Sequence, residues 1–453
     1  MGLIHLYILD SRETIIMKHK FTPFKNRDQK SKMIFGFLMF LMLSPLLFSF
    51  ITSWKGPELN SVQMTKVSIK DLGLKNFLEN IFQDKVESAC KNHIAFNNYW
   101  IRAHNELQYR LFRISATEKL VLGKNDFFYE EMYITEYLGR NFIGEDLMNK
   151  KVQALKKLQE ILLNQYNIYL IPVIEPGKAH FSPEEIPDRF HPNYKTRSNY
   201  ESFRDHAKNQ DVTFLDLNQY FKALKPTSPH LLYSKYGVHW SSYGMWQAAD
   251  TLTKFIEQVC QINLPDIIHL SDSNSTYNKD LDFDLEPPMN LLFPLPHESM
   301  NFPNKKIVCD STHTKPKVLT VGDSYYWSLM NNGYTHQMFS ENPYWYYNKT
   351  IWPDLWNFDN IVDTSKLKEI ILQNQIVLIM ITDANLYKFG WEFVEQSLQK
   401  FAPQDPVDSE LLMLNYLFSD INNYNYFRKE AIRKQIPFSE YLKIKIAENN
   451  NTQ

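Results

Sequence analysis

Two short segments of this 453-residue chain carry side chains that can act together as nucleophile and base. Ser324 follows the apolar run KVLTV in "KVLTVGDSYYWSL", and His239 lies in "KYGVHWSSYG", just before a helical pattern. A serine hydroxyl is a weak nucleophile until a base accepts its proton, and histidine suits that role because its pKa lies near neutral pH. The pair therefore predicts covalent catalysis through a serine ester, provided that folding brings the two side chains together.

Each signal also has a structural explanation. A Gly-Asp-Ser turn is common, and a histidine before tryptophan is more often packed or capping. Asp383 and Asn385 follow the run QIVLIMIT and can simply cap the next helix. With Ser324 as nucleophile, its own backbone N–H and the Asn385 amide can instead form an oxyanion hole. Because all of these residues are expected at the edge of one sheet, their combination favours a catalytic site over separate structural roles.

The elements that must position these residues alternate between strand and helix. The continuous apolar runs IYLIPVIE, TFLDL, KVLTV and QIVLIMIT indicate buried parallel strands. The amphipathic segments 147–163 and 245–256 indicate helices between them. This alternation predicts an α/β fold with a doubly wound parallel sheet, whose strands present ligands at their carboxyl ends. The polar residues at those ends are Glu175, Lys178, Asp216, Ser324, Asp383 and Asn385.

An uncharged stretch at residues 33–51 is long enough to cross a bilayer. Basic residues precede it, so the N-terminus is expected in the cytoplasm and everything after Trp54 outside it. A cleaved signal peptide is the alternative, and Met17 is an alternative start. We therefore expect a single-pass protein of the inner membrane with its C-terminal domain in the periplasm.

Composition excludes several classes of protein. The net charge of −2 gives no basic excess for nucleic acid. Three cysteines make no disulfide scaffold, and no Cys/His spacing indicates zinc, so we expect neither metal nor cofactor. The expected organisation is a basic N-terminus (1–32), an anchor (33–51), a helical linker (52–118), a catalytic domain (119–400) with a surface insertion at 265–315, and a C-terminal helical extension (401–453).

Four motifs together resemble one family. "VGDSYYWS" resembles the nucleophile block of SGNH-type enzymes, and "GVHWSSYG" resembles the Asp-x-His-Trp block of the alginate O-acetyltransferase branch (AlgX/AlgJ-like). "LVLGKNDFFYE" and "IPVIEPGKAHFSPEEIPD" are similar to two further segments of that branch. The histidine block precedes the serine block, as in that branch, which is circularly permuted relative to ordinary GDSL esterases. The resemblance covers about residues 90–400.

The resemblance implies an SGNH-like, flavodoxin-like three-layer α/β/α fold and an O-acyltransferase. Ser324 would carry the acetyl group and pass it to a polysaccharide hydroxyl, with His239 as base and then acid. The donor would be a membrane-bound O-acyltransferase partner. Two rival functions remain: an SGNH acetyl-esterase with water as acceptor, and a catalytically impaired glycan-binding scaffold of an export complex.

One position departs from the family. The acid expected two residues before His239 is Gly237. Without an orienting carboxylate, a serine–histidine pair usually loses rate. Three explanations stay open: Asp383 or Asp216 supports the ring, a backbone carbonyl orients it in a dyad, or catalysis has been lost. Asp323 is expected to be a structural cap.

Five residues are candidates for substrate binding: Lys178, Trp240, Tyr325, Trp345 and Tyr347. The aromatic stretch 341–356 either stacks on sugars or forms a packed rim. The segment "DLDFDLE", residues 280–286, lacks the glycine and spacing of an EF-hand, so a solvated loop is favoured over a calcium site.

Overall fold

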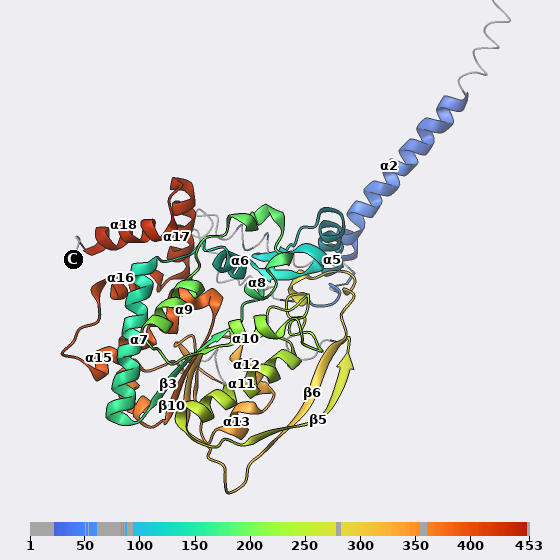
Figure 1. Ribbon diagram of the computed structural model, residues 1–453. Helices are drawn as coiled ribbons and strands as arrows, with labels where there is room; N and C mark the ends of the chain where they lie inside the picture. The colour runs from blue at the N-terminus through green and yellow to red at the C-terminus, as the bar shows by residue number, and fades with distance from the viewer. Residues whose placement is uncertain are drawn as a thin grey trace, which may run out of the picture. The chain divides into compact units, whose positions relative to one another are not determined.

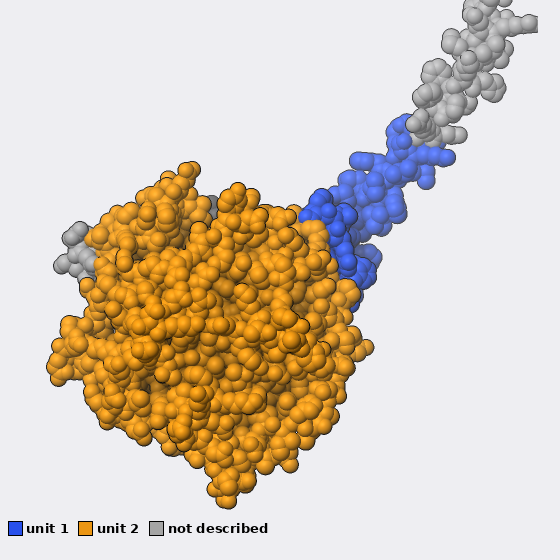
Figure 2. Space-filling model, viewed as in Figure 1, with its two compact units in different colours: residues 1–112, 290–294 blue, residues 113–289, 295–453 orange. Residues whose placement is uncertain are grey.

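The computed structural model describes residues 22–49, 51, 52, 54–60, 83, 85, 87, 94–277, 282–352 and 360–450. Two units are distinguished, residues 1–112 with 290–294 and residues 113–289 with 295–453 (Figure 2). Among the sequence features singled out, most of the basic N-terminal segment, Cys90, Asp280 and Trp356 lie outside the described residues.

The first unit contains one long apolar helix, α2 (Thr22–Ser49). Residues 28–49 of this helix are long and apolar enough to cross a membrane by length and composition. Its large side chains are exposed, Phe35 to 67% and Met42 to 76%, which water tolerates poorly. The unit also holds α5 (Asn97–Leu107) and the π-helical turn η2 (Gln108–Phe112).

The second unit is built on a six-stranded sheet (Figure 1). Five strands are parallel, as expected, and the short edge strand β9 runs antiparallel to β8, which makes the sheet mixed. In spatial order its strands are β4 (Leu215–Asp216), β3 (Tyr169–Glu175), β10 (Ile376–Thr382), β7 (Val318–Gly322), β8 (Tyr344–Tyr346) and β9 (Thr350–Ile351).

Helices cover both faces of this sheet, as Figure 1 shows for α7 on one side and α11 and α12 on the other. The alternate residues Leu319, Val321, Val377 and Ile379 point into one hydrophobic core with α7, because successive side chains of a strand face opposite ways. The helices of this unit are α6 (Glu131–Tyr137), α7 (Glu145–Tyr166), α8 (Lys178–Phe181), α9 (Asn199–Asn209), α10 (Leu217–Leu224), α11 (Ser242–Cys260), α12 (Tyr326–Asn331), α13 (Tyr334–Met338), α14 (Leu367–Leu372), α15 (Phe393–Phe401), α16 (Ser409–Phe418), α17 (Ile421–Lys434) and α18 (Phe438–Asn450).

Strands β3, β7 and β10 and helices α7 and α11 confirm the sequence prediction, since each is a strong apolar or amphipathic pattern. The run TFLDL was predicted as a full strand, but only Leu215–Asp216 pairs in β4. Asp216 then accepts a hydrogen bond from the Gln219 backbone N–H and starts α10. An N-cap side chain thus ends the strand early.

The insertion at 265–315 is an exposed surface excursion in one part only. The ribbon of β5 (Asp266–Ser275) and β6 (Met300–Val308) is antiparallel and largely exposed. The stretch between its strands is different, because Phe283 and Met289 are buried at 0% and 1% exposure. The prediction of a surface excursion is therefore wrong for this stretch, which enters the core beside the histidine segment.

Two antiparallel strands near the histidine segment also matter for the site. These are β1 (Leu120–Leu122) and β2 (Phe128–Glu130), joined by the 3-10 turn η3 (Lys124–Asp126). The chain therefore forms a strand, a turn and a strand here, and α6 begins directly after β2.

Candidate active site

Ser324 lies directly beyond the carboxyl end of β7, the fourth strand of the sheet. The loop is held by Asp323, whose Oδ2 accepts hydrogen bonds from the Thr382 backbone N–H, the Thr382 hydroxyl and the Asn385 amide, at 2.9, 2.8 and 2.9 Å. Asp323 therefore ties the serine loop to the end of β10. Its contacts are those of a structural cap.

Glu175 at the end of β3 is fully buried, and burial raises its pKa well above the usual range, with the charge of Asp323 adding to the effect. Both effects favour the protonated, uncharged form of Glu175 behind the serine loop. Two charges there would repel each other in a poorly solvated place.

His239 precedes α11, whose N-cap Ser241 accepts from the Gly244 backbone N–H. The Nε2 of His239 lies 2.8 Å from the Oγ of Ser324, across 85 positions of sequence. The ring is 7% exposed, and the Tyr325 ring lies 4.7 Å away between centroids. The structure therefore brings together the two side chains that the sequence singled out as nucleophile and base.

A carboxylate completes this arrangement. Asp284 Oδ2 lies 2.5 Å from His239 Nδ1, and Asp284 Oδ1 accepts from the Val238 backbone N–H at 2.7 Å. Burial alone would lower the pKa of His239, but the charge and hydrogen bond of Asp284, with Glu130 and Asp323, raise it overall. A hydroxyl, an imidazole and a carboxylate in this order are the parts of a catalytic triad.

The two acids considered for this role bond elsewhere. Asp383 Oδ2 lies 2.5 Å from His180 Nδ1 and accepts from the Asn218 amide. Asp216 accepts from the Tyr200 hydroxyl and caps α10. Both assignments as the orienting acid are corrected to Asp284.

The sequence contained a signal for Asp284 that was assigned to a solvated loop. In "DLDFDLE", Phe283 and Leu285 are buried on one side of the chain while Asp284 faces the other. The sequence alternates acidic and apolar residues, although residues 282–285 form turns in the structure, and the Leu285 backbone N–H donates to Tyr236 O. The segment therefore runs alongside the histidine loop.

Four of the five residues predicted to bind substrate are instead buried supports. Lys178, Trp240, Tyr325 and Trp345 are each exposed by 2% or less. Trp240 donates from Nε1 to the Ser328 hydroxyl, and the Tyr325 hydroxyl donates to Val238 O. Trp345 packs against Phe393 from β8. In this structure none of these four side chains is open to a ligand.

Lys178 supports the histidine segment from behind. Its Nζ donates to Lys235 O at 2.8 Å and Gly237 O at 2.5 Å, and it lies 4.2 Å from the centroid of the Phe127 ring. Burial lowers the pKa of Lys178 to about 7, against the opposing pull of the Asp284 and Glu298 charges. The lysine thus fixes the backbone two residues before His239.

The two proposed oxyanion donors differ in availability. The Ser324 backbone N–H makes no hydrogen bond to the part of the chain that the structure describes. The Asn385 amide is engaged, because its Nδ2 donates to Asp323 Oδ2 and to the Thr382 hydroxyl at 2.9 and 3.0 Å. Asn385 lines the cavity, so its amide can donate into it only by giving up one of these two hydrogen bonds.

A cavity of about 490 Å³ opens in front of Ser324 and His239. Trp327, Tyr346 and Tyr347 form one wall, with the Tyr346 and Tyr347 ring centroids 4.1 Å apart. The aromatic stretch thus divides: Tyr344 and Trp345 are packed inside, while the next two tyrosines face the cavity. Of the predicted substrate-binding residues, Tyr347 is placed where a ligand can contact it.

Glu130, at the end of β2, is a cavity residue that sequence reasoning missed. Burial raises the pKa of Glu130, the charge of His239 lowers it, and the charge of Asp284 raises it.

Within the described ranges, no group of three or more His, Cys, Asp or Glu side chains has an arrangement suited to a metal ion.

Three solved structures to which this chain is similar are remote from it in sequence. The O-acetyltransferase domain of Pseudomonas putida AlgJ is 18% identical, with a TM-score of 0.40 over 66% of this chain and 98% of that one. Pseudomonas aeruginosa AlgX is 16% identical, with a TM-score of 0.40 over 61% of this chain and 66% of that one. Bacillus cereus PatB1 is 13% identical, with a TM-score of 0.35 over 54% of this chain and 92% of that one.

Among curated proteins, none matches this sequence. A family model does match, over residues 120–267, a segment that contains β1, the Lys178 loop and His239 but ends before Asp284 and Ser324. The resemblance read from the motifs is thereby confirmed: over this segment the chain is similar to the SGNH hydrolase-like domain of acetyltransferase AlgX.

Proposed function

We propose that this protein is an extracytoplasmic O-acetyltransferase that passes an acetyl group through an ester of Ser324 to a hydroxyl of a polysaccharide. The observation that carries the proposal is the contact chain from Ser324 Oγ to His239 Nε2 and from His239 Nδ1 to Asp284. The match of residues 120–267 to the acetyltransferase AlgX model supports acetyl as the group transferred.

In the first half-reaction, Ser324 Oγ attacks the acetyl carbonyl of the donor while His239 Nε2 accepts the hydroxyl proton. The carbonyl oxygen becomes an oxyanion, toward which the Ser324 N–H and a rotated Asn385 amide donate. Asp284 stabilises the imidazolium by its charge. The tetrahedral intermediate then collapses, His239 returns the proton to the leaving group, and acetyl-Ser324 remains.

In the second half-reaction, a sugar hydroxyl enters the cavity and loses its proton to His239 Nε2. Its oxygen attacks the acetyl-serine carbonyl, the bond to Ser324 Oγ breaks, and the serine recovers the proton from His239. An ester is made for each ester broken, so the transfer needs no further reactant. Water in place of the sugar would make the same site an esterase.

The N-terminal helix supports a site outside the cytoplasm. Its length and apolar composition suit a membrane span, and the basic residues at its start favour an orientation that exports the rest of the chain. A membrane-bound O-acyltransferase is the donor that we propose, since an anchored enzyme meets such a partner at the bilayer.

The test is acetylation of the full chain in detergent micelles with 4-nitrophenyl acetate. Nitrophenol release and an acetyl group on the Ser324 peptide in mass spectrometry are expected for the native chain and for the control Ser340→Ala, an exposed serine. Both signals should be lost in Ser324→Ala.

A panel of neutral and acidic oligosaccharides then separates the functions. Acetylated oligosaccharide supports the transferase. Acetate released into water with every acceptor would make the protein an esterase. If no acetylation depends on Ser324, the enzyme proposal fails and a glycan-binding scaffold is the better account.

A further inference from the structure

We propose that α5 and the η2 turn after it form a second membrane contact, whose exposed apolar side chains lie flat in the interface of the bilayer that α2 spans. This inference rests on the membrane placement within the proposed function, and its test separates the two. All residues concerned belong to the first unit. The side chains of Trp100, Leu107, Leu111 and Phe112 are called the α5 apolar face below.

The pattern of α5 is inverted relative to that of a helix that packs in water. Its buried side chains are two asparagines, Asn98 at 2% and Asn105 at 7% exposure. The four side chains of the α5 apolar face are each exposed by 52% or more, and Leu111 reaches 65%. Large apolar side chains gathered on an exposed surface indicate a site of contact with a partner or a membrane.

Hydrogen bonds of the two asparagines fix the direction in which this helix faces. Asn98 Nδ2 donates to Pro57 O at 2.9 Å, and Asn105 Nδ2 donates to Asn290 O at 3.4 Å. Rolling the helix to bury its apolar residues would break both bonds and would leave buried amide and carbonyl groups unsatisfied. The α5 apolar face is therefore held outward by the fold of this unit.

The start of α5 is tied to the end of α2, the helix that is long and apolar enough to span a membrane (Figure 1). The Ala95 backbone N–H donates to the hydroxyl of Ser49, the last residue of α2, at 2.7 Å. The Phe96 backbone N–H donates to Trp54 O at 3.2 Å, and the Phe96 and Phe48 ring centroids lie 5.9 Å apart. Because a spanning α2 leaves the bilayer at Ser49, α5 begins at the lipid surface.

The spacing of the exposed residues suits a helix that lies flat. Trp100, Leu107 and Leu111 recur at i, i+7 and i+11, which places them in one line along the helix. With a rise of about 1.5 Å per residue, this line extends over about 15 Å. The exposed His104 lies between them, where lipid headgroups and water can solvate its ring. A flat helix brings the whole line to one depth, whereas an upright helix would bring only its start near lipid.

The residues around the α5 apolar face also suit a lipid interface. Trp54 and Trp100 are about half exposed, and tryptophan prefers the level of the headgroups. The one acid of α5, Glu106, accepts from the Leu292 backbone N–H at 3.1 Å and from Arg110 Nε at 2.8 Å. Its side chain is 13% exposed, whereas that of Arg110 is 51% exposed. An apolar face bordered by a cation is typical of a helix that lies on a membrane.

The test uses the full chain in vesicles of phosphatidylethanolamine and phosphatidylglycerol, with no other protein present. The native cysteines are replaced by alanine, and the dye NBD is attached to Trp100→Cys, Leu107→Cys or Leu111→Cys. We expect nitroxide-bearing lipids to quench each label at least about threefold more than NBD on glutathione in water. Quenching at positions 100 and 111 should agree within about 1.5-fold, as a flat helix requires. The label on Met42→Cys in α2 is the reference for the bilayer core.

A charged variant assigns the lipid contact to this face. With the label on Trp100→Cys, Leu107→Asp/Leu111→Asp should reduce quenching to the level in water, whereas Leu107→Ile/Leu111→Ile should keep it. Both positions are exposed, so circular dichroism should show the same helix content in the two variants.

Three outcomes would decide against one claim or the other. Unquenched labels at 107 and 111, with Met42→Cys quenched, would overturn the second contact and leave the anchor in place. Quenching that falls steeply from 100 to 111 would also overturn it, because the helix would then stand upright. An unquenched label at position 42 would refute the membrane span of the proposed function, while quenching at 107 and 111 would still support the α5 contact.

Discussion

A Cβ atom on Gly237 would lie 2.5 Å from the carbonyl oxygen of Asp282. Real Cβ atoms do not approach so closely, so the chain at 282 occupies the space that a side chain at 237 would need. The same segment brings Asp284 to His239 two residues later. The carboxylate beside His239 thus comes from a different segment than the family pattern predicts, and a side chain at 237 would need the space that residue 282 occupies.

Gly237→Asp should therefore not replace Asp284. We expect Gly237→Asp to destabilise the fold by about 1–3 kcal/mol, because overpacking displaces the 282–284 segment. The double variant Gly237→Asp/Asp284→Asn should remain inactive toward 4-nitrophenyl acetate. Recovery of the native rate in the double variant would show that the acid can act from either position. Ser340→Asp, at an exposed serine, is a control for added charge.

Asp284→Asn should lower kcat/KM on the order of 10³- to 10⁴-fold, because the imidazolium loses its support. Asp284 also raises the pKa of His239. Removing the charge of Asp284 lowers that pKa, so neutral His239 persists to lower pH. The acidic limb of the pH–rate profile should therefore shift to lower pH. The matched control Asp383→Asn alters an acid that pairs with His180, and its acidic limb should stay in place. Equal shifts in both variants would argue against Asp284 as the partner of His239.

Lys178→Met should destabilise the protein, since the carbonyls of Lys235 and Gly237 lose a buried donor, at about 1–3 kcal/mol for each. The folded pKa of Lys178 is about 7, below its unfolded value. From pH 7 to 10 the unfolded state therefore binds more protons, and this lysine makes the free energy of unfolding rise with pH. Urea titrations at pH 7 and 9 should show a smaller rise for Lys178→Met than for the native chain. A rise of the same size would mean that Lys178 keeps its charge over this range.

The C-terminal helices should be part of the core and not a separable extension. Leu414 of α16 is fully buried, in one cluster with α7 and the sheet. Leu414→Ala should lower the free energy of unfolding by about 2–5 kcal/mol. Leu412→Ala in the same helix, at a side chain 38% exposed, should change it by less than about 0.5 kcal/mol. A small effect at both positions in urea unfolding would show that the helices are peripheral.

Much of the fold could be predicted from the sequence, because a buried strand or an amphipathic helix is a pattern within one short segment. The strands at 169–175, 318–322 and 376–382 are continuous apolar runs, and a strand buried on both faces needs no other pattern. The short strands β8 and β9 were missed, since the three aromatic residues of β8 suit a packed rim as well as a strand.

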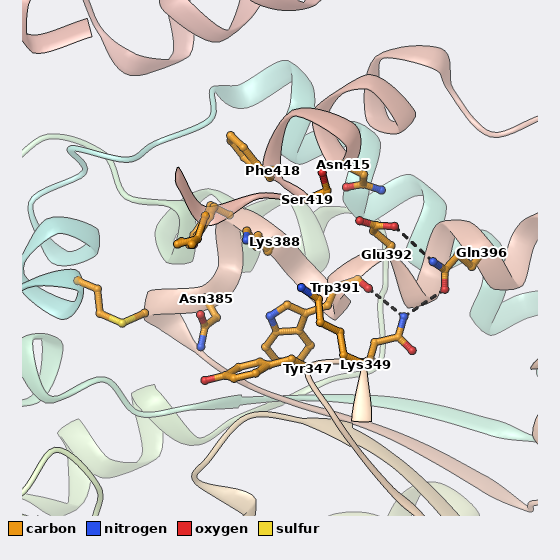
Figure 3. A pocket seen from close by; sticks show the side chains of 14 residues that line it. Tyr347, Lys349, Asn385, Lys388, Trp391, Glu392, Gln396, Asn415, Phe418 and Ser419 are labelled. Carbon is orange, nitrogen blue, oxygen red and sulfur yellow. Dashed lines mark hydrogen bonds between the residues drawn. The ribbon is translucent and has the colours of Figure 1, made fainter. Parts of the chain in front are cut away.

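The sequence by itself determined the nucleophile and base candidates and the sheet whose strand ends present the serine, because residue type and hydrophobic period are properties of short segments. The tertiary structure alone decided which carboxylate lies beside His239 and that Lys178 is a buried support. Asp284 is 45 positions from His239, and Tyr347 and Trp391 meet from different elements (Figure 3). Contacts at such separations depend on how loops cross over the sheet, which no periodic pattern encodes.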